Sequence, residues 1–206
     1  QLTDKYTSEY ANFYRAEDLF EKGKYSAAQE EYKAFTKEFS DKNHPYVIKA
    51  RYYTALCALY LYHADAEQQL LGFLKDYPES IYRQEVYFEL GRYYFRKNSF
   101  KNVVKWMQKV DVNELDEDLH PEYYFKLGYA YFRQKQPKAA RDAFYEVINV
   151  EESQYKNPAL YYYSHIAYTE GNYEVALEGF KKLEHDPAFK KTVPRYIAQI
   201  LYLQGK

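Results

Sequence analysis

Apolar and aromatic positions recur along the chain with the spacing of one helix face, and two of the most aromatic stretches carry a glycine at the same place. The stretches are YFELGRYYF (87–95) and YFKLGYAYF (124–132), whose glycines Gly91 and Gly128 lie 37 residues apart. A glycine inside a helix costs about 1 kcal/mol relative to alanine, so close approach of a second helix is expected to offset it. The shared position predicts a repeated helical element.

Small residues mark the same frame through the whole chain. They lie 39, 36, 37, 36 and 34 residues apart, at Ala16, Ala55, Gly91, Gly128, Ser164 and Ala198. A second series follows eleven or twelve residues later, at Ala28, Ala66, Val103, Ala140 and Ala176. Each pair predicts a hairpin of two helices, whose backbones approach at the small residues while aromatic side chains fill the flanks.

Proline and glycine punctuate these hairpins. Proline is expected to end a helix between one hairpin and the next, and it occurs in SDKNHP (40–45), YPES (77–80), LHPE (119–122), KNPA (156–159) and HDPA (185–188). Pro137 is expected in the first turn of a second helix, where it is tolerated. Gly23 and Gly171 occupy matching turns inside hairpins and are expected to be left-handed. The pattern predicts an all-α chain of five hairpins and one further helix.

The repeated unit resembles the tetratricopeptide repeat, in which aromatic-x2-Leu-Gly-x2-Tyr is followed by Ala-x3-Phe in the second helix. The first half occurs as Tyr87, Leu90, Gly91 and Tyr94, and again as Tyr124, Leu127, Gly128 and Tyr131. The second half occurs as Ala140 with Phe144, Ala176 with Phe180, and Ala28 with Tyr32. The resemblance implies a right-handed superhelix, a single array over residues 1–206. The expected units are about 9–44, 45–80, 81–119, 120–156 and 157–190, with a half unit at 191–206.

One longer phrase resembles the bacterial cell-envelope branch of this family, which includes the Tol-Pal accessory protein and the outer-membrane assembly lipoprotein. The phrase is KDYPESIYRQEVYFELGRYYF (75–95). It implies an exported, periplasmic protein, although no lipobox cysteine lies near Gln1 and a cytoplasmic location stays open. The stretch AQILYLQGK (198–206) repeats the frame of AEDLFEKGK (16–24), so we expect a fragment of a longer array.

Composition excludes several other classes. Lys plus Arg (29) nearly balances Asp plus Glu (30), so no global basic field would attract nucleic acid. The mean hydropathy of −0.77 and the lack of a long apolar run argue against a transmembrane helix. The single cysteine, Cys57, allows no intramolecular disulfide and is expected to be a buried small hydrophobe.

No pattern of catalytic or metal-binding residues stands out. The histidines are well separated and are expected to be surface or turn residues: His44, His63, His120, His165 and His185. The acidic stretch DVNELDED (111–118) lacks the spacing and glycine of a calcium loop and is expected to be a solvated loop. No phosphate loop or nucleophile motif is present. We therefore expect a chain that is not an enzyme and takes no cofactor or metal.

The family resemblance implies that recognition resides in a groove lined by the first helices. Two columns are expected to face it and are aromatic save one leucine: Phe13, Tyr52, Phe88, Phe125 and Tyr161, then Phe20, Leu59, Phe95, Phe132 and Tyr168. An alternative main role is burial between neighbouring first helices, with only the ring edges facing the groove. The central prediction is a partner-binding groove of Phe88, Arg92, Phe95, Arg96, Phe125, Tyr129, Phe132, Arg133, Tyr161, His165 and Tyr168.

Charge along this groove is expected to change sign. Glu17 and Glu21 make its start acidic, whereas Arg92, Arg96 and Arg133 make its middle basic and suited to an acidic partner. Pairing of these arginines with Glu85, Glu89 or Glu122 is an equal alternative. The lysine and asparagine used by family members that clamp chaperone C-termini are absent.

Two functions follow from this reading. The first is a non-catalytic protein-interaction scaffold that binds a peptide or partner segment, in a bacterial envelope assembly. The second is a carbohydrate-binding envelope module that stacks sugars on tyrosine. Trp106 is expected on a second helix away from the groove, which counts against sugar stacking.

Overall fold

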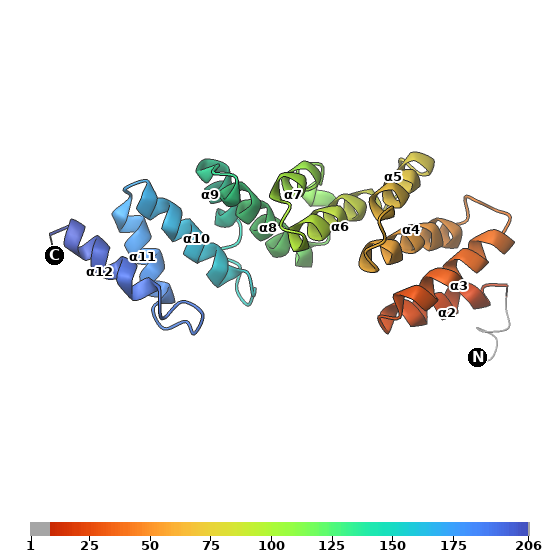
Figure 1. Ribbon diagram of the computed structural model, residues 1–206, viewed down its shortest axis with the longest axis horizontal. Helices are drawn as coiled ribbons and strands as arrows, with labels where there is room; N and C mark the ends of the chain where they lie inside the picture. The colour runs from red at the N-terminus through yellow and green to blue at the C-terminus, as the bar shows by residue number, and fades with distance from the viewer. Residues whose placement is uncertain (1–8, 206) are drawn as a thin grey trace. The chain divides into compact units, whose positions relative to one another are not determined.

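The computed structural model describes residues 9–205, and every regular element within them is a helix (Figure 1). The chain divides into two compact units, Gln1–Glu89 (unit 1) and Leu90–Lys206 (unit 2). None of the helices in the described residues is long and apolar enough to span a bilayer. The predicted single array over residues 1–206, with its unit bounds, stays a prediction.

Unit 1 is built from antiparallel neighbours that pack in chain order. Its helices are α2 (Ala11–Glu21), α3 (Tyr25–Glu38), α4 (Pro45–Tyr60) and α5 (Ala66–Asp76), followed by the first half of α6 (Arg83–Arg96). Helix α3 packs against both α2 and α4, and α4 packs against α5 (Figure 1). The core between α2, α3 and α4 includes Phe13, Tyr32 and Phe35, each no more than 2 % exposed.

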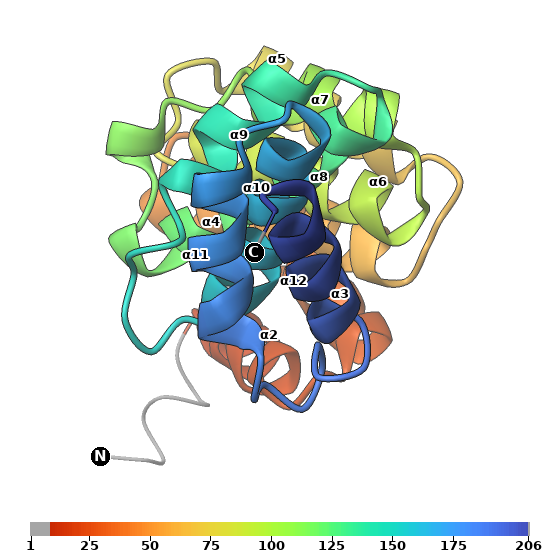
Figure 2. The same cartoon turned by 90° about the vertical axis from the view of Figure 1, so that its left-hand side faces the viewer.

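Unit 2 continues with the same alternation of helices. After the second half of α6 come α7 (Phe100–Met107), α8 (His120–Arg133), α9 (Pro137–Tyr145), α10 (Lys156–Thr169), α11 (Tyr173–Leu183) and α12 (Val193–Leu203). Helix α8 packs against α9, α9 against α10, α10 against α11 and α11 against α12 (Figure 2). Buried cores lie around Phe144 and Val147, and around Phe180 and Ile200.

The small residues lie where helices meet. Ala16, Ala55, Gly91, Gly128 and Ser164 are all buried, as is the whole second series from Ala28 to Ala176, whereas Ala198 is exposed. A Cβ added to Gly91 would lie 2.6 Å from the Met107 side chain, and one added to Gly128 would lie 2.9 Å from the Phe144 ring. The close neighbour is therefore mainly a large side chain, not the partner backbone we expected, although the Ala140 carbonyl lies 3.3 Å from the Gly128 position.

A left-handed residue ends each of the first helices seven positions after its small residue. Glycine fills this place at Gly23, Gly171 and Gly205, but Tyr62, Asn98 and Lys135 adopt the same conformation, with φ between 55° and 58°. At Lys135 the backbone N–H donates to the Phe132 carbonyl, and the next N–H donates to the Tyr131 carbonyl. The turns at Gly23, Tyr62, Asn98 and Gly171 repeat this pair of hydrogen bonds, which is the Schellman pattern.

The prolines at the hairpin boundaries lie in two kinds of position. Pro78 and Pro187 lie in connecting turns, as expected. Pro45, Pro121 and Pro158 instead lie in the first turn of α4, α8 and α10, where the missing N–H has no helical partner to lose. These three helices therefore begin before or at their proline, and Pro137 likewise begins α9.

Candidate functional site

A continuous series of half-buried aromatic rings runs across the first helices of four successive hairpins in unit 2. We call it the aromatic strip, and it consists of Phe95, Tyr129, Phe132, Tyr162, His165, Tyr168 and Tyr196. Centroid separations are 5.7 Å for Phe95–Tyr129, 5.2 Å for Tyr129–Tyr162, 5.7 Å for Phe132–His165, 5.7 Å for His165–Tyr196 and 5.3 Å for Tyr168–Tyr196. Each of these side chains is partly buried and partly accessible to solvent.

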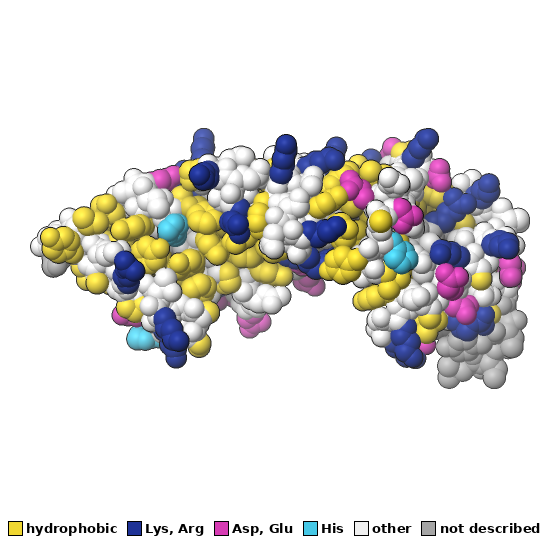
Figure 3. Space-filling model, viewed as in Figure 1, with side chains coloured by type: hydrophobic (Ala, Val, Ile, Leu, Met, Phe, Trp, Pro, Cys, Tyr) yellow, Lys and Arg dark blue, Asp and Glu magenta, His cyan; other side chains and the backbone are white. Residues whose placement is uncertain are grey.

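The helical frame explains why these rings line up. The strip residues come from α6, α8, α10 and α12, which are the helices that begin each hairpin. The rings lie three or four residues apart on a helix, so they share a face, and the repeat brings the same face of the next helix alongside. Hydrophobic side chains gather on one face of unit 2 over α8, α10 and α12, with Lys and Arg side chains among them (Figure 3).

Tyr129 is the residue with the most ring neighbours in the strip. Its ring lies within 6.5 Å of the rings of Phe95, Phe100, Phe125, Phe132 and Tyr162, centroid to centroid. Edge-to-face and tilted arrangements of this kind are favourable beyond the apolar area that they bury. The surrounding rings therefore hold Tyr129 in place while its hydroxyl reaches the surface.

Arg133 lies at the exposed border of the strip, one turn after Tyr129 on α8. Its guanidinium carbon lies 4.8 Å from the centroid of Phe100 and 5.8 Å from that of Tyr129. Nη1 of Arg133 also donates a hydrogen bond to the Tyr129 hydroxyl oxygen at 3.2 Å. Two ring faces and one hydrogen bond thus position a charged group that solvent can still reach.

A charge triad flanks the strip near Phe95. The Glu122 carboxylate accepts from Nε of Arg92 at 2.8 Å and from Nζ of Lys126 at 2.5 Å, and Lys126 also lies over the Phe95 ring at 5.2 Å. Burial raises the pKa of Glu122, but hydrogen bonds from Arg92 and Lys126 outweigh it, so that the net pKa is lowered. Glu122 is thus held ionised, and Arg92 is committed to it.

His165 lies within the strip rather than on the open surface or in a turn. Its ring neighbours Phe132 and Tyr196, and Nδ1 lies 3.2 Å from the Tyr196 hydroxyl oxygen. Burial lowers the pKa of His165 below 6.5, so the neutral imidazole is favoured at neutral pH. At that pH His165 behaves as a polar aromatic ring.

The structure separates the predicted groove residues into groups. Phe95, Tyr129, Phe132, His165 and Tyr168 belong to the strip. Phe125 and Tyr161 contact strip rings but also pack on Phe144 and Phe180, towards the cores. Arg96 is exposed. The prediction is wrong for Phe88, because this residue is only 1 % exposed, belongs to the core of unit 1 and offers no surface to a partner.

Sequence reasoning missed Tyr162 and Tyr196, which complete the strip. Both lie two residues before the small residue of their helix, and Tyr14 and Tyr53 occupy the same position in unit 1. That recurrence of tyrosine is the signal that would have found them. Phe100 was missed as well, since its place at the start of a second helix gave no reason to connect it with Arg133.

In unit 1 two rings lie against an ion pair, and one of them, Tyr53, holds the position that Tyr162 has in the strip. Lys49 Nζ lies over Phe13 and Tyr53, at 5.8 and 5.4 Å from the ring centroids, and forms an ion pair with Glu17 at 2.6 Å. Glu17 also accepts from the Tyr32 hydroxyl at 2.8 Å. The predicted acidic start of the groove is therefore wrong for Glu17, whose charge Lys49 balances, whereas Glu21 is exposed.

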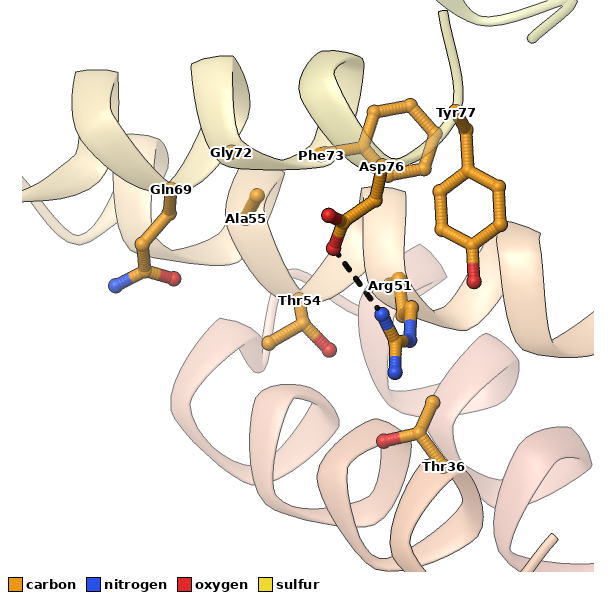
Figure 4. Close-up of a pocket in the computed structure, with 9 residues that line it drawn as sticks. All are labelled: Thr36, Arg51, Thr54, Ala55, Gln69, Gly72, Phe73, Asp76 and Tyr77. Carbon is orange, nitrogen blue, oxygen red and sulfur yellow. Dashed lines mark hydrogen bonds and ion pairs between the residues drawn. The ribbon is translucent and has the colours of Figure 1, made fainter. Parts of the chain in front are cut away.

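A shallow pocket of about 330 Å³ lies between α3, α4 and α5 of unit 1 (Figure 4). Arg51 extends into it and approaches Asp76, with Nη1 3.4 Å from the carboxylate, and its guanidinium lies 5.7 Å from the Tyr77 ring. The rest of the wall is formed by Thr36, Thr54, Ala55, Gln69, Gly72 and Phe73. The arginine here is already engaged by a carboxylate, so the pocket presents no uncompensated charge to a ligand.

Two further candidates are structural in role. In the loop 111–118, the side chains of Asp111 and Asp116 accept hydrogen bonds from the backbone N–H of Asn113 and Asp118, which caps two short 3-10 turns. Within residues 9–205 no group of three His, Cys, Asp or Glu side chains is placed to hold a metal ion. Cys57 is 0 % exposed, and burial raises the pKa of its thiol to about 12.

Comparison with known proteins agrees with this fold. The tetratricopeptide repeat family model matches residues 122–150, which cover most of α8 and all of α9. The C-terminal part of a TPR repeat-containing protein from Cytophaga hutchinsonii has a TM-score of 0.70 at 19 % identity, over 98 % of this chain and 79 % of that one. MamA from AMB-1 has a TM-score of 0.66 at 17 % identity, over 86 % and 91 %.

These likenesses establish the fold class. A second MamA structure has a TM-score of 0.63 at 19 % identity, over 89 % of this chain and 94 % of that one. At such identities the similarity concerns the fold alone, and it confirms the predicted all-α solenoid of tetratricopeptide type. Comparison with the curated proteins finds no match.

Proposed function

We propose that this chain is a non-catalytic scaffold that binds a peptide or helical segment of a partner protein along the aromatic strip. The observation that carries the proposal is the strip itself: half-buried rings from the first helices of four successive hairpins, bordered by an exposed arginine. Aromatic and arginine side chains contribute most of the energy of protein interfaces, and rings already held by their neighbours lose little entropy on binding.

The tetratricopeptide-type fold supports a protein partner in general. Repeat folds of this type present side chains from successive helices on one continuous surface, which suits a ligand that extends across several repeats. The strip spans α6, α8, α10 and α12 and so offers contacts to an extended segment more readily than to a compact small molecule.

We further propose that the partner belongs to a bacterial cell-envelope assembly and that the chain acts in the periplasm. The support is the resemblance of residues 75–95 to envelope members of the family. Fractionation of cells that express the native gene tests this part by itself: recovery in the cytosol would refute the location and leave the scaffold role untouched.

Carbohydrate binding is the competing function, and the arrangement of the rings disfavours it. Sugar stacking needs an open ring face, whereas Tyr129 and Tyr162 meet edge to face at 74°, so that the edge of one ring covers part of a face of the other. Trp106 is only 4 % exposed. A glycan array that shows specific binding, abolished by changes in the strip, would favour this alternative.

The scaffold role is tested by selecting random dodecapeptides displayed on phage against the whole chain and measuring the affinity of the best binders by fluorescence polarisation. The variant Tyr129→Leu/Phe132→Leu keeps apolar volume and removes two ring faces, so Kd is expected to rise at least tenfold. Tyr145→Leu is the matched control, because Tyr145 is 56 % exposed on α9 outside the strip. Equal loss in both variants, or in neither, would refute the strip as the site.

A further inference from the structure

Arg133 has a cationic group that is held in place and yet not neutralised by a carboxylate. Its contacts among residues 9–205 are the rings of Phe100 and Tyr129 and the Tyr129 hydroxyl. No ion pair to Arg133 occurs within the described part of the chain, and its side chain is exposed. Stacking fixes the plane of the guanidinium and leaves part of its fork of N–H donors directed to solvent.

Two other cations that lie over rings are already paired with carboxylates. Lys126 over Phe95 shares Glu122 with Arg92, and Lys49 in unit 1 is closed by Glu17. Paired cations of this kind stabilise the fold and give little to a ligand, since a new carboxylate would have to displace the old one. Arg133 differs from them, although the sequence alone predicts Arg92 and Arg133 equally as arginines that bind an acidic partner.

We propose that Arg133 binds a carboxylate of the partner segment, so that the strip selects a peptide with an acidic group beside a large apolar residue. The inference rests on the proposed function and names the ligand chemistry of that site. A planar guanidinium can form two parallel hydrogen bonds to a carboxylate. The Tyr129 hydroxyl accepts from Arg133 and keeps its own proton, which can be donated to the same carboxylate.

The rings beside Arg133 account for the apolar half of the motif. Tyr129 and Phe132 lie on α8 within one turn of Arg133, and Tyr162 of α10 packs against both at 5.2 and 5.1 Å. An apolar side chain next to the acidic group would cover these half-buried rings. The carboxylate belongs either to an Asp or Glu side chain or to a peptide C-terminus, which the experiment below distinguishes.

The test is a double-mutant cycle with the display-selected peptides. Each peptide is synthesised with its acidic residue as such and as the amide (Glu→Gln or Asp→Asn), and separately with a free and an amidated C-terminus. On the wild-type chain, the relevant acid-to-amide change is expected to raise Kd about tenfold. On Arg133→Gln the same change is expected to alter Kd less than twofold, and Arg133→Lys should recover part of the preference. The preference should also shrink as salt rises from 50 to 500 mM.

Lys105→Gln is the matched control, because Lys105 is an exposed cation over the Trp106 ring of unit 2, outside the strip. It should leave the acid-to-amide effect unchanged. Peptides that depend on Tyr129 and Phe132 but lack a carboxylate, or whose acid-to-amide effect persists in Arg133→Gln, would overturn the role of Arg133 and leave the scaffold intact. If no selected peptide depends on the strip, the proposed function fails and the inference fails with it.

Discussion

Unit 1 and unit 2 each hold a cationic side chain against aromatic rings, but they differ in whether a carboxylate pairs with that cation. In each unit a cation lies over two aromatic rings, Lys49 in unit 1 and Arg133 in unit 2. Lys49 forms an ion pair with Glu17, which also accepts from a tyrosine hydroxyl, whereas among residues 9–205 Arg133 contacts two rings and a hydroxyl but no carboxylate. The same helical repeat therefore produces a cation paired with a carboxylate in unit 1 and a cation that can still bind a carboxylate in unit 2.

The two units also differ in how their helices approach each other. Unit 1 has alanine at its small positions, Ala16 and Ala55, whereas unit 2 has Gly91 and Gly128 opposite the large side chains of Met107 and Phe144. In the α10–α11 pair the glycine lies on the second helix instead of the first, and a Cβ added to Gly179 would overlap Oγ of Ser164 on α10. Packing in unit 2 thus depends on missing Cβ atoms, which makes it more sensitive to added volume.

The largest expected effect tests this difference in packing. Gly128→Leu should destabilise the protein by about 3 kcal/mol, because its side chain would meet the Phe144 ring and the Ala140 carbonyl. Gly72→Leu in α5 of unit 1 is the control, since nothing lies within 4 Å of its Cβ position. It should be neutral or slightly stabilising, as a helix interior gains from losing glycine. Urea denaturation measures both, and equal losses would contradict the comparison.

The next effect concerns the two closed charge clusters. Glu122→Gln should cost about 2 kcal/mol at pH 7, because it leaves Arg92 and Lys126 half-buried without their carboxylate. Glu17→Gln in unit 1, whose pair with Lys49 is more exposed, should cost about 1 kcal/mol.

Acid should remove the Glu122 contribution. Its pKa is lowered by folding, so the stabilisation is complete above its unfolded value near 4.5 and is lost as pH falls through the lower folded value. The gap in unfolding free energy between wild type and Glu122→Gln should therefore narrow from pH 7 to pH 2. A constant gap over that range would show that the charge of Glu122 does not stabilise the fold.

Replacement by phenylalanine should distinguish half-buried Tyr53 of unit 1 from buried Tyr123 of unit 2. Burial first, and then the charges of Glu85 and Glu17, raise the pKa of Tyr53 to about 12, so its contribution is complete below pH 10 and is lost as pH rises towards 12. Tyr53→Phe should reduce the loss at pH 11 by about 1 kcal/mol. In unit 2 burial likewise raises the pKa of Tyr123 to about 12, but its hydroxyl donates to the Met107 carbonyl at 3.0 Å.

Tyr123→Phe should accordingly cost about 1 kcal/mol already at pH 7, since it leaves a buried carbonyl without that donor. Thermal melting at pH 7 and pH 11 compares the two variants. The interpretation is wrong if Tyr53→Phe is no more resistant to alkali than the wild type.

The smallest effect concerns the left-handed turns. Lys135→Gly should stabilise by about 0.5 kcal/mol, because the relief at φ 58° exceeds the entropy that glycine adds to the unfolded chain. The reverse change at the matching turn of unit 1, Gly23→Lys, should destabilise by about 1 kcal/mol. Chemical denaturation of the two variants side by side gives both values, and opposite signs are required.

The repeat frame could be predicted from sequence because small residues report close contacts directly. The intervals from Ala16 to Ser164 indicated where helices meet, and the left-handed residues follow at the same intervals. Tyr62 and Lys135 could not be predicted as left-handed, since their side chains disfavour that conformation and the hydrogen bonding of the preceding helix imposes it. Asn98 differs, because asparagine is found at this helix-ending position more readily than other residues with a side chain.

The candidate site could be predicted only in part, because burial and pairing depend on three-dimensional neighbours. Phe88 and Phe95 look equivalent in the pattern, yet the first is in a core and the second is in the strip. Arg92 and Arg133 are likewise both arginines of first helices. Only the position of Glu122, 30 residues after Arg92, separates a structural arginine from an available one.

The buried thiol of Cys57 provides a probe for local opening of unit 1 alone. The side chain is inaccessible and protonated at neutral pH, so a thiol reagent can modify it only when α4 opens. At high reagent concentration the rate of thiol labelling measures the opening rate of unit 1. The rate of amide hydrogen exchange reports on opening in both units. The difference between the two rates would show whether the repeats open as one block or one unit at a time.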